Sequence, residues 1–149
     1  MTAEVKPFPT PNITQITDSH CLIDPGEYEV AYLLHRTSTR FKRPNMTIWF
    51  QVISPGAAFG LYLPRYYNLE WVRKNGAFKA MRHSDCTREF IAVTDEPVKR
   101  LDRIPLADRY KGRVILARVD TVTTDSKNQK LPELARYSVI KQLLRSCTG

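Results

Sequence analysis

Cations and aromatic rings alternate closely in the stretch TSTRFKRPNMTIWFQV, which covers positions 37–52. Three cations surround Phe41, and Trp49 follows within the same stretch. Arginine and lysine side chains bind phosphate oxygens, and an aromatic ring offers a flat face on which an unpaired base can stack. The residue types in this stretch therefore suit contact with a nucleic-acid strand.

The distribution of charge favours the same chemistry. The chain of 149 residues has a formal net charge of +8. Between positions 30 and 84, Glu70 is the only acid among nine Lys and Arg residues, so this segment carries the whole net charge. Ten of the 15 aromatic residues also lie in it. Such a segment is typical of a surface that meets a polyanion. A solvated basic surface beside an ordinary aromatic core is the alternative.

Residues for other kinds of chemistry are sparse. His20 with Cys21, and the sequence HSDC at 83–86, supply His and Cys, but no CxxC-type pair typical of a zinc knuckle occurs. The sequence has no Gly-rich phosphate loop and no GxSxG or HExxH motif. A nuclease would need several acids together, and the basic segment lacks them. We therefore predict no catalytic residue, no metal and no cofactor, and expect the three cysteines to be free thiols.

Alternating apolar residues predict three strands that would position the cations and rings. On the second strand, Ile48 and Phe50 lie on the side that would fill a core, so Trp49 is expected to point outward. Pro64 in the third strand indicates a sheet edge or a bend. The predicted segments are a strand at about 27–36, a basic loop at 37–43, a strand at about 45–53 and a strand at about 59–67.

The second half of the chain begins with a predicted helix. Ser84 is a good N-cap and Asp85 suits the first turn, so HSDCTREFIAV indicates a short helix. A charged connector with one helical turn follows, and then a fourth strand at about 113–123 and a polar loop. The region 134–144 stays open between a fifth strand and a closing helical turn.

This succession predicts a mainly β fold with a short helix: a five-stranded OB-like barrel in the order β-β-β-α-β-β. We expect one domain over residues 22–149, preceded by an extended or disordered arm over residues 1–21. The arm lacks the basic start and apolar middle of a signal peptide, and no run is long enough to span a membrane, so a cytoplasmic location is expected.

The OB fold binds oligonucleotides on its second and third strands and through two of its loops. Rings on that face would stack on bases, and cations in the loops would hold phosphates. The predicted nucleic-acid contacts are Arg36, Arg40, Phe41, Lys42, Arg43, Trp49, Tyr62, Arg65, Tyr66, Tyr67, Lys79, Arg82, Lys127 and Lys130.

Several motifs resemble known proteins. PGEYEV, the Thr-rich basic loop and PNMTIWFQV resemble the first hairpin of small single-stranded-DNA-binding proteins of phages and integrative mobile elements. GLYLPRYYNL, GAFKAMRHSD and KGRVILARVDTV resemble uncharacterised proteins of mobile elements, so the similarity covers about residues 22–144. The resemblance implies that the loop at 37–43 and Trp49 fall in the binding region.

The expected function is non-enzymatic binding of single-stranded DNA in replication, recombination or transfer of such an element. RNA is not excluded as the ligand. A homo-oligomer, or association with replication or recombination proteins, would be compatible with this function. The alternative is a protein-interaction module, such as an anti-defence or regulatory factor, that uses the same basic face.

Overall fold

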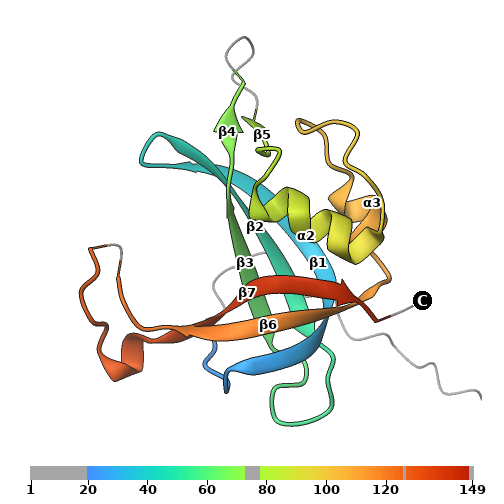
Figure 1. Cartoon of the computed structure of the whole chain (residues 1–149). Coiled ribbons are helices and arrows are strands. Elements are labelled where there is room, and N and C mark those ends of the chain that lie inside the picture. Colours follow the sequence, from blue (N-terminus) through green and yellow to red (C-terminus); the bar gives the residue numbers. More distant parts are fainter. Residues whose placement is uncertain (1–19, 73–77, 126, 148–149) are drawn as a thin grey trace, which may run out of the picture.

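Five long strands form one antiparallel sheet in the order β3-β2-β1-β6-β7 (Figure 1). The computed structural model describes residues 20–72, 78–125 and 127–147. The mainly β fold is confirmed, but the described strands β3 and β7 at the two edges share no backbone ladder, so the sheet is not closed into a barrel. The strands are β1 Gly26–Arg40, β2 Arg43–Val52, β3 Tyr62–Asn68, β6 Val114–Val122 and β7 Tyr137–Ser146.

Smaller elements lie between β3 and β6 and before β7. The predicted helix is confirmed, since the Ser84 hydroxyl accepts the Thr87 N–H and so caps the first turn. The helical turn predicted in the connector is confirmed as a second, short helix. The elements are β4 Glu70–Trp71, β5 Phe78–Lys79, α2 Asp85–Thr94, α3 Leu106–Tyr110 and the 3-10 helix η1 Glu133–Ala135.

The core lies between one face of the sheet and helices α2 and α3. Ile48 and Phe50 of β2 are fully buried on this face, as the alternation predicted. Tyr110 of α3 packs on Phe50 and on Phe90 of α2, with ring centroids 6.5 Å and 5.9 Å apart respectively. Aromatic pairs at such distances add to the stability gained from burying apolar area.

The predicted basic loop at 37–43 is wrong, because most of it is strand. β1 continues to Arg40, which pairs with Arg43, and only Phe41 and Lys42 form the turn. Both turn residues have positive φ, 52° and 61°, which is the two-residue turn whose twist matches that of the flanking strands. This end of β1 is exposed and polar, so it carries no apolar alternation by which a strand could be recognised.

The last described element is strand β7, so of the two alternatives for 134–144 the fifth strand is confirmed and the closing helical turn is wrong. Ile140 and Leu143 are both buried although they are three residues apart, which is a helix-like spacing. The register explains it: Val119 faces Ile140, whereas the next two residues back along β6 face Gln142 and Leu143. The residue of β7 between Ile140 and Gln142 has no counterpart across the ladder and forms a bulge, which shifts the alternation by one position.

The start of the described chain lies against β7. The Ser138 N–H donates to the Cys21 carbonyl at 2.8 Å, and the Ile23 N–H donates to the Ser138 hydroxyl at 2.9 Å. The predicted arm at 1–21 lies mainly outside the described residues. In the described parts of the chain, no helix combines the length and the apolar character needed to cross a membrane.

Candidate nucleic-acid interface

The face of the sheet opposite the helices brings predicted site residues together. Directly paired residues of an antiparallel ladder share a face. Arg36 of β1 pairs with Thr47 of β2, which pairs with Tyr66 of β3, so these side chains form one row. We call this surface the outer face; on β1, β2 and β3 it comprises Arg36, Ser38, Arg40, Asn45, Thr47 and Tyr66.

Tyr66 is the exposed ring of the outer face, with 44% of its surface accessible. Its pKa is raised by partial burial and by the nearby Tyr137 of β7, while Arg40 acts in the opposite direction. The His20 ring lies 5.3 Å from that of Tyr137. The outer face therefore continues from the β1–β2 hairpin across Tyr66 to the beginning of β7.

A second group of rings lies at the end of the β1–β2 hairpin. Phe41 is 80% exposed, and the Arg40 guanidinium lies 5.5 Å from the centre of its ring. The Trp71 indole N–H donates to the Lys42 carbonyl at 3.0 Å, which fixes the β4–β5 hairpin against this turn. Trp71 is 42% exposed and packs edge-on against Phe78. We call this group the aromatic tip; it comprises Arg40, Phe41, Lys42, Arg43 and Trp71.

Trp71 was missed by the sequence reasoning. It follows Glu70, the only acid of the basic segment, and precedes VRKN. The cations in this short run were the sequence feature that could have indicated Trp71 as a site residue.

Trp49 corrects the sequence interpretation. It lies on the outer side of β2, as predicted, but it is only 4% exposed, so the expectation of an open stacking ring is wrong. In the ladders Trp49 is flanked by Leu34 and by the buried Pro64. A bulge in β1 just before Leu34 alters the alternation of that strand and places Leu34 beside the indole. Trp49 therefore belongs to a small apolar cluster outside the main core.

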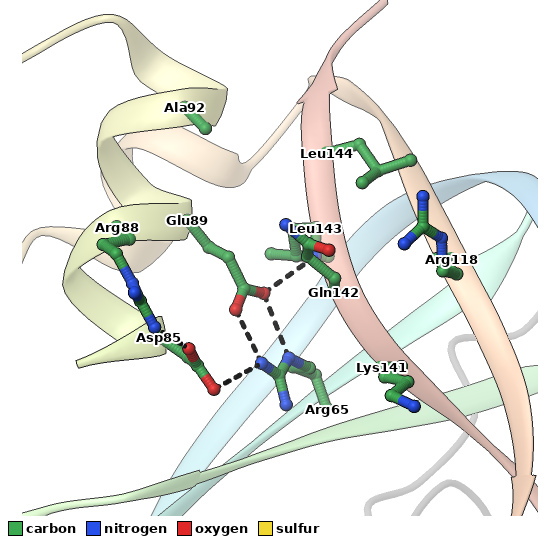
Figure 2. Close-up of a pocket in the computed structure, with 10 residues that line it drawn as sticks. All are labelled: Arg65, Asp85, Arg88, Glu89, Ala92, Arg118, Lys141, Gln142, Leu143 and Leu144. Atoms are coloured by element: carbon green, nitrogen blue, oxygen red, sulfur yellow. Dashed lines mark hydrogen bonds and ion pairs between the residues drawn. The ribbon is translucent and has the colours of Figure 1, made fainter.

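Arg65 and Tyr67 also require correction, because both point inward to Glu89 of α2. The Arg65 guanidinium donates to the two Glu89 carboxylate oxygens at 3.0 Å and 2.6 Å, and the Tyr67 hydroxyl donates to one of them at 2.9 Å. The same oxygen accepts the Leu143 N–H of β7 at 2.7 Å. Figure 2 shows Glu89 between Arg65 and Leu143. We call the group Arg65, Tyr67, Glu89 and Leu143 the seam, because it joins the two edges of the sheet.

The seam is a structural group rather than a binding surface. The Arg65 and Glu89 side chains are only 11% and 5% exposed, and the Arg65 guanidinium also lies 4.4 Å from the centre of the Tyr67 ring. Burial and the neighbouring Glu89 hold the pKa of Tyr67 well above its usual value. Burial likewise raises the pKa of the Cys86 thiol to about 12. These groups keep their protons at neutral pH and serve packing.

A pocket of about 540 Å³ opens beside the seam, with Arg88 and Asp85 of α2 on one side and Arg118 and Lys141 of the strands on the other (Figure 2). Most of its charges are compensated. Arg88 pairs with Asp85, and Lys141 lies 3.5 Å from Asp120. The pocket therefore offers little free positive charge to a ligand.

The other predicted contacts lie apart from these groups or are partly buried. Tyr62 lies on the same side of β3 as Tyr66, as predicted, but it is half-buried. Lys79 is half-buried and lies 4.0 Å from Glu70. Arg82 is exposed before α2. Lys127 and Lys130 are exposed in the β6–β7 connection, which extends to the same side of Figure 1 as the β1–β2 hairpin.

The chain matches no protein-family model, no curated protein and no solved structure. Within the described ranges, no three His, Cys, Asp or Glu residues gather closely enough to hold a metal ion. What the site can do is therefore inferred from its geometry: exposed rings for stacking, and exposed cations for phosphates.

Proposed function

We propose that this protein binds single-stranded DNA, without catalysis, on the outer face and the aromatic tip. One observation carries the proposal. The exposed rings of Tyr66, Phe41 and Trp71 lie on a surface whose cations have no acidic partner within ion-pair distance among the described residues. These cations are Arg36, Arg40, Lys42 and Arg43.

The two parts of this surface suit the two parts of a nucleotide. A ring can stack only on a base that is not paired, and such stacking contributes about 1–3 kcal/mol per base with little dependence on sequence. Unpaired cations attract the phosphates, because each contact releases counterions condensed on the strand. The combination favours a single strand over a duplex.

The proposed fold is an open variant of the OB barrel, in which the seam takes the place of a ladder between β3 and β7. In OB folds the face of the second and third strands and two connecting loops form the binding region. Here these correspond to the outer face, the β1–β2 turn and the β6–β7 connection. Together with the resemblance of the first hairpin, this supports a cytoplasmic role in replication, recombination or transfer of a phage or mobile element.

The test is fluorescence anisotropy with labelled oligonucleotides of equal length as single-stranded DNA, duplex DNA and single-stranded RNA. We expect single-stranded DNA to bind more tightly than duplex, with similar affinity for different base sequences. Equal affinity for duplex would contradict the stacking role of the rings. No binding of either form at low salt would exclude the proposal and favour the alternative, a protein-interaction module that uses the same basic face.

A further inference from the structure

The connection between α2 and α3 folds into a pocket remote in sequence from the proposed DNA surface. Its volume is about 430 Å³, which lies in the range of small-molecule sites. The pocket has apolar walls and a basic rim. The lining residues are Phe90, Glu96, Pro97, Lys99, Arg100, Arg103, Pro105 and Arg109.

Two of the four cations that line this pocket form ion pairs with acidic residues. Arg109 lies 2.7 Å from Glu96. Arg100 donates to both oxygens of Asp102, at 3.0 Å and 2.7 Å, and this hydrogen bonding lowers the pKa of that carboxyl. The pairs hold these cations in place and compensate their charge.

The other two cations, Lys99 and Arg103, remain available. Neither has an acid within ion-pair distance in the described part of the chain, although Arg103 is near enough to contribute weakly to the lowered pKa of Asp102. Lys99 is a mobile point charge, whereas the planar fork of an arginine matches two oxygens of one phosphate. Two uncompensated positive charges at one rim suit a phosphate group.

The apolar walls distinguish this pocket from a simple anion site. Pro97 and Pro105 border it, and their rings restrict the backbone and present rigid apolar surface. A bare phosphate would leave these walls unused, whereas a base or sugar would cover them. We propose that the pocket binds a nucleoside phosphate, with Lys99 and Arg103 on the phosphate and the prolines against the base or sugar.

Such a group could be a free nucleotide or the 5′-terminal nucleotide of a strand. The first test is isothermal titration calorimetry of the full chain with AMP, adenosine and inorganic phosphate. AMP should bind more tightly than either part alone. The double variant Lys99→Ala, Arg103→Ala should weaken AMP binding about 10-fold or more, since hydrogen bonds to charged groups are lost. Lys111→Ala, which removes an exposed cation outside the pocket, should leave it unchanged.

Several results would overturn the proposal: no binding of AMP, equal AMP affinity in the wild type and both variants, or phosphate that binds as tightly as AMP. Circular dichroism shows whether the double variant is folded, and the conservative Lys99→Arg, Arg103→Lys variant should recover most of the affinity. Because no DNA is present, the outcome is independent of the proposed function.

A second measurement separates the two sources. If the natural ligand is a strand terminus, a 5′-phosphorylated oligonucleotide should compete with AMP and a 5′-hydroxyl oligonucleotide should not. If it is a free nucleotide, neither should compete.

Discussion

The seam and the aromatic tip use cations from the same acid-poor segment in opposite ways. At the seam, the guanidinium of Arg65 is buried and doubly hydrogen-bonded to Glu89, which lies 24 residues later in the chain. At the tip, Arg40 and Lys42 are exposed and meet no acid among the described residues. A charge that is unbalanced in the sequence is therefore free only where the fold brings no acid to it.

The largest effect is expected at the seam. Glu89→Gln would leave the buried Arg65 without its counter-charge, which should lower the free energy of unfolding by about 3–5 kcal/mol. Urea denaturation measures this. Asp85→Asn is the matched control, since Asp85 also lies near Arg65, at 3.6 Å, but is largely exposed. Its effect should be about 1 kcal/mol or less. Equal losses in both variants would show that burial of the pair is not the decisive feature.

A pair of aromatic variants should separate the roles of the two kinds of ring. Trp49→Ala removes a buried ring and should cost about 3–5 kcal/mol of stability. Tyr66→Ala removes an exposed ring and should weaken binding of single-stranded DNA by about 1–3 kcal/mol, with the unfolding free energy almost unchanged. Denaturation and anisotropy on both variants are the measurements. The reverse pattern would mean that Trp49, not Tyr66, is the stacking ring.

The smallest effect is expected from the cations of the tip, and it concerns the salt dependence of binding. Each phosphate contact contributes about 0.7 to the slope of log affinity against log salt for a single strand. Replacing Arg40, Lys42 and Arg43 by Ala should make this slope shallower by about 2. The loss should be similar for different base sequences, because phosphate contacts carry no sequence information. A salt titration of this variant beside Lys111→Ala gives the comparison; identical slopes would exclude the tip from the interface.

These contrasts also show what could be predicted from the sequence. The core side of β2, the Ser84 cap and the position of β6 follow from alternation and capping, which act over a few residues. The sequence around Glu89 did not indicate its role in the seam, because its hydrogen-bond partners come from β3 and β7. The end of β1 and the strand β7 could not be recognised from local patterns either. The end of β1 is polar throughout, and β7 contains bulges that interrupt its alternation.

Of the predicted site, the exposed hairpin cations and Tyr66 come together on one surface, whereas Trp49, Arg65 and Tyr67 are buried. The difference lies in tertiary packing. Leu34 and Pro64 flank Trp49, and Glu89 draws Arg65 and Tyr67 inward. Strand parity correctly predicted the side of the sheet on which Trp49 lies, but not what covers it.

The seam also bears on self-association into aggregates. An edge strand exposes unpaired backbone groups that can pair with a strand of another molecule, and proteins protect such edges with charges, prolines or bulges. Both edges here carry these devices: β3 contains Pro64, which has no N–H to offer, and on β7 the Leu143 N–H is occupied by the Glu89 carboxylate beside a bulge. The Glu89 carboxylate joins the two edges of the sheet, and by occupying this N–H it also prevents a strand of another molecule from pairing there.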